Sequence, residues 1–259
     1  MKKVYAFFAV VIAVYAILFI AQKSIQISDI VGSELSPDEA ITMLTEGNDR
    51  YVANESEYPN QNQRRRALTS SKGQHPFATV LTCSDSRVPV EILFDRGIGD
   101  IFVVRVAGNV VDIDEAGSIE YGVDHLATPV LVILGHTHCG AVTAVVHDEK
   151  LHGKIPPLVD NIIPAVIKTK EKYPQLHGDA LIQEAVTFNV WQAIEDLFKE
   201  SPISVKRIKM GKLKVVGAIY DIESGKVAWL GQHPKQSELM AKQADKESAH
   251  ESEQQHHTK

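Results

Sequence analysis

Three short runs of apolar and β-branched residues in the middle of the chain constrain its fold more than any other feature. They span residues 78–82, 101–106 and 130–134, and amphipathic helical patterns lie between and after them. A strand that is apolar at almost every position is buried on both faces, which is typical of a parallel sheet covered by helices. The sequence therefore predicts a single-domain α/β fold with a mainly parallel central sheet flanked by helices.

Helical patterns and a hairpin fill most of the remaining chain. The helical patterns cover about residues 115–127, 139–147, 157–172 and 178–200. Two late strands, 213–220 and 226–230, flank the turn Glu223-Ser224-Gly225 and predict a hairpin. Nearer the N-terminus, Ser36 can cap a helix whose first turn contains Pro37 and Glu39, so a helix is expected to begin there.

The charge of the chain excludes one class of partner. Its 259 residues are 23% charged with a formal net charge of −6, so there is no broad basic face of the kind that nucleic acid requires. The triplet Arg64-Arg65-Arg66 is the densest basic run before the last third of the chain. We interpret it as a solvated surface turn and expect no nucleic-acid partner.

The first residues of the chain differ in character from the rest. Lys2 and Lys3 precede an uncharged apolar run from Val4 to Ala21, and roughly 18 apolar residues are enough to cross a bilayer. Phe19 stands where a signal-peptidase site would need a small residue. The segment is therefore predicted to be a membrane anchor, with a cleaved signal segment as the alternative.

The charges around this segment predict its orientation. Lysines precede it and acidic residues follow it, which favours an N-terminus on the cytoplasmic side. The domain that follows the segment is then expected to be in the periplasm, anchored to the inner membrane, or secreted to the periplasm if the segment is cleaved. The expected division is an anchor or signal segment at 1–22, a linker at 23–35, one domain at 36–232, and a disordered polar tail at 233–259.

The only two cysteines, Cys83 and Cys139, each follow a predicted buried strand, and His136 lies three residues before Cys139. Ligands gather at the carboxyl ends of parallel strands. Two thiolates and one imidazole leave a fourth zinc position open, which is the catalytic pattern. Gly135 and Gly140 are expected to let the backbone turn tightly there. A disulfide between the two cysteines is the alternative for an exported protein.

A carboxylate and a guanidinium follow the first cysteine at alternate positions. In Cys83-Ser84-Asp85-Ser86-Arg87, an extended backbone would point Cys83, Asp85 and Arg87 to the same side. Arg87 can then hold Asp85 ionised through paired hydrogen bonds. The alternative is a structural ion pair at the end of a strand.

The motif Cys83-x-Asp85-x-Arg87, followed by Gly135-His136-x-x-Cys139-Gly140, resembles the signature of the β-class carbonic anhydrases. The resemblance covers about residues 36–231. It implies a lyase (carbonate dehydratase) in which zinc-bound hydroxide converts carbon dioxide reversibly to bicarbonate and a proton. It also implies one Zn²⁺ per subunit, held by Cys83, His136 and Cys139.

The resemblance assigns further residues. Asp85 and Arg87 would form a dyad beside the metal, and because the aspartate itself binds zinc in some members, Asp85 is also a candidate metal ligand. Gln74, Phe102 and Tyr121 resemble the substrate-pocket residues of plant-type members. In those members a second subunit contributes part of the lining, which implies a homodimer or a higher homo-oligomer.

Two other functions fit the same residues. A carbon disulfide or carbonyl sulfide hydrolase of this fold would use the same metal ligands. A non-catalytic zinc or redox-sensing module would need the cysteines and His136 but would have no use for the Asp85–Arg87 pair. The pair therefore favours a catalytic zinc site.

Overall fold

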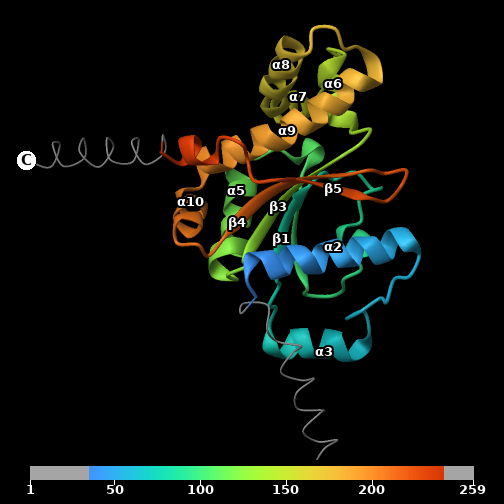
Figure 1. Cartoon of the computed structure of the whole chain (residues 1–259), viewed down its shortest axis with the longest axis vertical. Helices are drawn as coiled ribbons and strands as arrows, with labels where there is room; N and C mark the ends of the chain where they lie inside the picture. Colours follow the sequence, from blue (N-terminus) through green and yellow to red (C-terminus); the bar gives the residue numbers. More distant parts are fainter. Residues whose placement is uncertain (1–34, 242–259) are drawn as a thin grey trace, which may run out of the picture.

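The computed structural model describes residues 35–241, which fold around one five-stranded sheet (Figure 1). The strands are β1 (Ala78–Thr82), β2 (Ile101–Arg105), β3 (Val130–His136), β4 (Lys214–Tyr220) and β5 (Val227–Gly231). Their order across the sheet is β2-β1-β3-β4-β5. The first four strands are parallel, and β5 pairs with β4 in the antiparallel sense. The predicted α/β fold, its mainly parallel sheet and the late hairpin are confirmed.

Helices cover both faces of the sheet and extend beyond its carboxyl edge. Before β3 the helices are α2 (Pro37–Ala53), α3 (Gln63–Lys72), α4 (Val90–Leu93), the 3₁₀ turn η1 (Ala107–Asn109), α5 (Ile113–Glu120) and the π-helical turn η2 (Tyr121–His125). After β3 they are α6 (Gly140–Val146), α7 (Ile155–Val159), the 3₁₀ turn η3 (Asp160–Ile162), α8 (Ile163–Lys172), α9 (Gly178–Glu200) and α10 (Pro202–Lys209).

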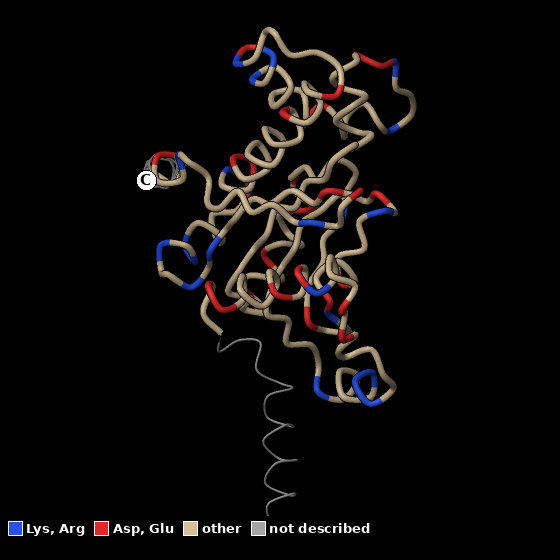
Figure 2. The backbone as a smooth tube through the Cα atoms, turned by 45° about the vertical axis from the view of Figure 1, so that its right-hand side comes forward, with Lys and Arg blue, Asp and Glu red and all other residues tan. Residues whose placement is uncertain are grey.

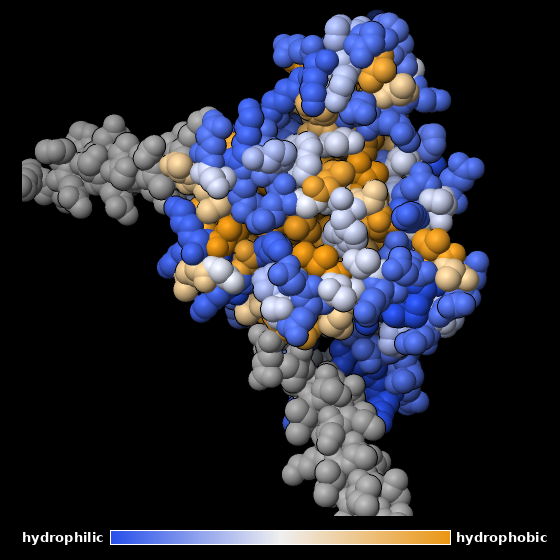
Figure 3. Space-filling model, viewed as in Figure 1, coloured by the Kyte–Doolittle hydropathy of each residue, from blue (hydrophilic) through white to orange (hydrophobic). Residues whose placement is uncertain are grey.

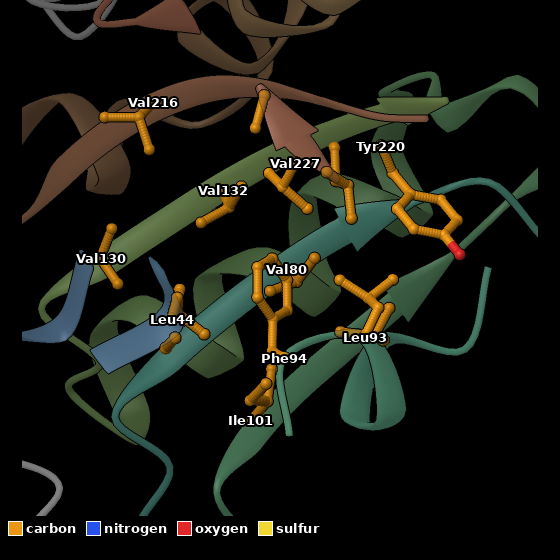
Figure 4. Close-up of a cluster of buried hydrophobic side chains, with 14 of the residues drawn as sticks. Leu44, Val80, Leu93, Phe94, Ile101, Val130, Val132, Val216, Tyr220 and Val227 are labelled. Atoms are coloured by element: carbon orange, nitrogen blue, oxygen red, sulfur yellow. The ribbon is translucent and has the colours of Figure 1, made fainter. Parts of the chain in front are cut away.

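Side chains of successive strand residues enter two different cores. Val80 and Val132 pack with Leu44 of α2 and Phe94, which follows α4, on one face of the sheet (Figure 4). The neighbouring residues Leu81, Leu131 and Ile133 pack on the other face against α5, α9 and α10. Since residues along a strand alternate between faces, apolar residues at every position are what a sheet covered on both sides requires.

The first described helix begins where the sequence predicted. Ser36 caps α2 by accepting a hydrogen bond from the Glu39 amide, and the Glu39 carboxylate accepts one from the Ser36 amide. Pro37 occupies the first helical position, where its missing amide hydrogen is not needed. The capping box thus fixes the point at which the chain enters the domain.

The basic triplet is not the solvated turn that we expected, because its central residue is buried. The triplet lies in α3, and the guanidinium of Arg65 is 3.0 Å from the carboxylate of Asp100. Arg65 Nε also donates to the Ile98 carbonyl at 2.7 Å. A buried charge is tolerated when it is paired and hydrogen-bonded, so Arg65 joins α3 to the chain before β2.

The segment predicted to be a polar tail begins with residues that contact the domain. His233 is buried, its ring centroid is 5.3 Å from that of Trp191, and its Nδ1 accepts the Lys235 amide at 3.0 Å. Leu239 and Met240 pack against the core beneath α9 and α10. His233, Leu239 and Met240 therefore connect residues 233–241 to the domain, and residues 242–259 lie outside the described part.

The predicted anchor at 1–22 and nearly all of the predicted linker at 23–35 lie outside the described residues. Within residues 35–241, no helix combines the length and the apolar character that crossing a bilayer requires.

The contact between α2 and the end of α4 can be tested at Gly47. A Cβ at this position would lie 1.9 Å from the Phe94 carbonyl oxygen, whereas a Cβ at Gly117 in α5 would meet nothing within 4 Å. We expect Gly47→Ala to lower the free energy of unfolding by about 3 kcal/mol, since backbone has to move. Gly117→Ala should raise it by about 0.5–1 kcal/mol. Urea denaturation of both variants measures this, and equal midpoints would contradict the close packing.

Candidate metal centre

The parallel sheet brings Cys83, His136 and Cys139 together at its carboxyl edge. Cys83 directly follows β1, His136 is the last residue of the neighbouring strand β3, and Cys139 is the N-cap of α6. Their ligand atoms all lie within 4.8 Å of one another, and all three residues are buried. The two cysteines are free thiols, so the disulfide alternative does not describe this structure.

His136 has one ring nitrogen in use and one without a partner. Its Nδ1 is 2.9 Å from the Thr137 carbonyl oxygen, and its buried Nε2 has no hydrogen-bond partner among the described residues. Because a carbonyl only accepts, Nδ1 carries the hydrogen and Nε2 keeps a lone pair. Leaving a buried acceptor unsatisfied costs free energy. A metal-binding histidine typically donates from one ring nitrogen to a carbonyl and binds the ion through the other, so a metal ion is the partner that Nε2 of His136 fits.

The surroundings of the two sulfurs favour one negative charge, on Cys83. A hydrogen bond with the Cys139 thiol is the main cause that lowers the pKa of Cys83 to about 4, and the same pairing raises the pKa of Cys139. The Gly108 amide also donates to Cys83 Sγ at 3.2 Å. The pair therefore shares one proton, and a divalent cation that replaces this proton binds both sulfurs as thiolates.

Gly108 and Asn189 belong to the centre although the sequence did not single them out for it. Gly108 has a φ of 78°, and a Cβ there would lie 2.6 Å from Ile162, so glycine is needed to bring its amide to the sulfur. The buried Asn189 side chain of α9 donates to the Gly108 carbonyl at 2.6 Å. A glycine two residues after a predicted parallel strand was the available signal for Gly108, whereas nothing in the helical pattern of α9 marks Asn189.

The set of two sulfurs and one imidazole fits zinc. Zinc binds thiolate and imidazole in tetrahedral geometry, and three protein ligands leave a fourth position for a reactant. The lone pair of His136 Nε2 and the shared proton of the two cysteines are the features of this structure that such an ion would satisfy. The residues present therefore fit the metal that the sequence predicts.

Asp85 and Arg87 are paired, but not through the extended backbone that we expected. The chain turns after Asp85, whose carbonyl accepts the Val88 amide at 3.1 Å. The turn brings Arg87 Nη2 to 2.7 Å and Arg87 Nε to 3.0 Å from the two carboxylate oxygens. These hydrogen bonds lower the pKa of Asp85 to about 2. The carboxylate is thus held by Arg87, and Asp85 lies outside the group of three metal-ligand candidates.

Two arginines tie together the loops that carry the ligands. Arg87 Nη2 donates to the His138 carbonyl at 3.2 Å, which links the loop after β1 to the loop after β3. Arg105, the last residue of β2, donates to the carbonyls of Cys83 and Asp85 at 3.2 and 2.6 Å. Arg105 therefore holds the loop after β1 to the neighbouring strand β2, and Arg87 holds the loop after β3 to the loop after β1.

The tight turn between His136 and Cys139 is made by a residue other than the glycines that we expected. His138 has a φ of 55°, whereas neither Gly135 nor Gly140 has a positive φ. Gly135 serves packing instead, because a Cβ there would lie 2.7 Å from Val190 of α9. The glycine lets α9 lie close over the strand that ends in His136.

Gln74, Phe102 and Tyr121 are not brought to the metal-ligand candidates of their own subunit. Phe102 is level with Thr79 in the sheet, four residues before Cys83 and so about 13 Å along the strand from it. The Tyr121 ring lies 5.7 Å from that of Phe102 and is 46% exposed. Gln74 is exposed in the segment before β1. All three lie toward the amino edge of the sheet, away from the three ligands.

Comparisons with known proteins agree on one family. The family model described as carbonic anhydrase matches residues 78–227. The chain is 37% identical over 195 residues to carbonic anhydrase 2 of Mycobacterium tuberculosis, covering 74% of this chain and 91% of that protein. Its structure is similar to the β-carbonic anhydrase CafA of Aspergillus fumigatus, with a TM-score of 0.63, 27% identity and coverage of 78% and 95%. The Coccomyxa β-carbonic anhydrase in complex with acetazolamide gives a TM-score of 0.58, 27% identity and coverage of 71% and 82%.

The ligand assignment predicts the effect of removing one sulfur. In Cys83→Ser we expect zinc content per subunit to fall below about a tenth of the wild-type value, since a serine hydroxyl is not ionised at neutral pH and binds zinc weakly. Metal analysis of the purified full chain measures this. Ser84→Ala, which removes the exposed hydroxyl next to it, serves as the control and should keep its zinc. A folded, zinc-loaded Cys83→Ser protein would contradict the assignment.

Proposed function

The chain belongs to the β class of the carbonic anhydrase family, and on this premise we propose that it hydrates carbon dioxide reversibly at the Cys83–His136–Cys139 centre. The reaction joins carbon dioxide and water into bicarbonate and releases one proton. The observation that carries the assignment is the buried, unpartnered Nε2 of His136 beside two free cysteines at one edge of the sheet.

Zinc, when bound at this centre, supplies the Lewis acidity that lowers the pKa of water toward about 7. The chain supplies the position of the reactants. Asp85, two residues after Cys83, accepts a hydrogen bond from the attacking oxygen, so that a lone pair of this oxygen is directed at the carbon of carbon dioxide. Arg87 holds the Asp85 carboxylate in one orientation through two hydrogen bonds.

The role of Asp85 is orientation and not proton storage. Its pKa is lowered to about 2, mainly by the Arg87 hydrogen bonds, so at neutral pH it remains a carboxylate and is too weak a base to keep the proton. The proton released by the reaction then leaves through water or buffer. A group fixed in its ionised state before the reaction needs no reorganisation when charge develops.

Asp85→Asn tests this role. An amide presents one oxygen and no negative charge, so we expect zinc content to be retained and kcat to fall by about a hundredfold or more. Stopped-flow hydration of carbon dioxide measures kcat. Glu91→Gln removes an exposed carboxylate on the nearby helix α4 and should leave kcat unchanged. A normal rate for Asp85→Asn would remove Asp85 from the mechanism.

We propose that Gln74, Phe102 and Tyr121 act in the pocket of a second subunit, which implies a homodimer or a higher homo-oligomer. The support is their place in the fold, because one subunit keeps them toward the opposite edge of the sheet from its own ligands. The Tyr121 ring is exposed and contacts those of Phe102 and His125 at centroid distances of 5.7 and 4.6 Å. A patch of aromatic rings in tilted contact, with the Tyr121 ring open to solvent, fits an apolar wall for carbon dioxide.

We further propose that the apolar segment 1–22 anchors the enzyme in the inner membrane, with its catalytic domain in the periplasm. The support is the uncharged run from Val4 to Ala21, which is long enough to cross a bilayer, and the lysines that precede it. If the segment is cleaved, the same orientation releases the domain into the periplasm.

Protease treatment of intact spheroplasts tests the location. We expect the domain to be degraded from outside, because the orientation predicted by the flanking charges places it there, and an alkaline carbonate wash should leave the intact chain in the membrane fraction. A cytoplasmic marker protein must survive the same treatment. Full protection of the domain would refute export, and release by carbonate would refute the anchor.

A further inference from the structure

Helix α10 and the turn that follows it form a basic surface on an otherwise acidic chain. Residues 202–214 contain no Asp or Glu, although the whole chain has a net charge of −6. Their basic residues are Lys206, Arg207, Lys209, Lys212 and Lys214. Figure 2 shows blue segments gathered at the left side of the domain, where Figure 1 places α10. We call residues 202–214 the α10 surface.

Three of the five positive charges have no acidic partner among the residues that the structure describes. Arg207 is 3.4 Å from Asp124, and Lys214 is 2.5 Å from Asp38. Lys206, Lys209 and Lys212 are exposed and form no ion pair with any residue in the described range 35–241. Their charge is available to a partner outside the domain.

The same surface exposes apolar side chains between the lysines. Ile203 is 39% exposed and Met210 is 54% exposed, while Val205 and Ile208 on the opposite side of the helix pack into the core. Figure 3 shows apolar residues among hydrophilic ones at the left of the domain, where α10 lies. Lysines that flank apolar side chains on one helix face are typical of a helix that lies on an anionic bilayer.

The α10 surface lies beside the point where the chain enters the domain. The Lys214–Asp38 ion pair joins it to the first turn of α2, and Figure 1 shows α10 on the side of the domain from which α2 begins. Residues 22–36 separate α2 from the end of the apolar segment, and fifteen residues span at most about 50 Å when fully extended. A bilayer that holds this segment is therefore within reach of the surface.

We propose that the α10 surface docks on anionic phospholipid headgroups and holds the domain against the bilayer. The inference rests on the membrane anchor proposed above. A protein partner fits the surface less well, because lysine is depleted at the centres of protein interfaces, and here three unpaired lysines surround only two exposed apolar side chains. Each lysine near an anionic surface strengthens binding about fivefold, so three strengthen it on the order of a hundredfold.

Docking through this surface leaves the metal centre accessible. The α10 surface ends at Lys214, which pairs with Val130 at the start of β3, while His136 pairs with Tyr220 six residues further along the sheet. Six strand residues span about 20 Å. The lipid contact and the three ligands of the same subunit therefore lie at opposite ends of β3 and β4.

Lysine footprinting of the full zinc-loaded chain tests the proposal. The protein is reconstituted in vesicles of phosphatidylcholine alone, or of phosphatidylcholine mixed with phosphatidylglycerol, and acetylated with an amine-reactive ester before mass spectrometry. We expect Lys206, Lys209 and Lys212 to react about tenfold more slowly in the anionic vesicles. The exposed Lys150 and Lys154, near α7, should react equally in both. High salt should abolish the difference, since it screens exposed charges.

A charge-removed variant gives a second measurement. In Lys206→Gln/Lys209→Gln/Lys212→Gln, oxidation of Met210 by hydroxyl radicals should be as fast in anionic as in neutral vesicles, with carbon dioxide hydration unchanged. The matched control Lys150→Gln/Lys154→Gln/Lys226→Gln removes three exposed lysines elsewhere and should keep the protection of Met210. In the wild-type chain, equal lysine reactivity in the two vesicles would overturn the proposal.

Protection of the α10 lysines in both kinds of vesicle would also overturn it, because a second copy of the chain or residues 242–259 would then be the cover. The carbonate wash distinguishes failure of the docking contact from failure of the proposed anchor. A chain that resists the wash but shows no lipid-dependent protection keeps its anchor and loses only the docking contact.

Discussion

The parallel pairing of β1 with β3 is the constraint on which the rest of the site depends. Thr82 is level with Leu134 in the sheet, and its hydroxyl donates to the Leu134 carbonyl at 2.9 Å. This register places Cys83 beside Gly135 and one residue from the level of His136. A slip by one residue would reverse the direction of every side chain on a strand, so the burial of Val80 and Leu81 on opposite faces fixes the register that places the ligands.

The site has two charged parts, the buried metal ligands and the half-exposed pair of Asp85 and Arg87. The cysteines and His136 are buried. A cation bound there would satisfy the lone pair of His136 Nε2 and replace the proton that the two cysteines share. Asp85 lies at the rim, where Arg87 keeps it ionised and also holds the His138 carbonyl. One guanidinium thus fixes a carboxylate beside the centre and connects the two loops that carry the metal ligands.

Much of this could be read from the sequence because it depends on local patterns. Apolar runs of strand length predicted three of the five strands as parallel and buried, a late hairpin was predicted for the other two, and the capping residues predicted the start of α2. The spacing of Cys83, Asp85, Arg87, His136 and Cys139 predicted the metal ligands and the ion pair.

What local patterns could not reveal were contacts between distant segments. Arg65 was expected in a solvated turn because its partner Asp100 is 35 residues away, and the buried His233 was assigned to a tail because Trp191 and Glu195 belong to another helix.

The sequence by itself determined the chemistry, because the types of the ligand residues and their places at strand ends are properties of the chain. The tertiary structure decided which atoms are available. It left His136 Nε2 without a partner, made Gly108 and Asn189 part of the sulfur environment, and turned the backbone after Asp85 so that Arg87 folds back onto it. It also kept Phe102 and Tyr121 away from their own metal centre. The physical reason is that hydrogen bonds and burial depend on which segments meet in space, and residues 25 to 81 positions apart meet only after the sheet and its helices have packed.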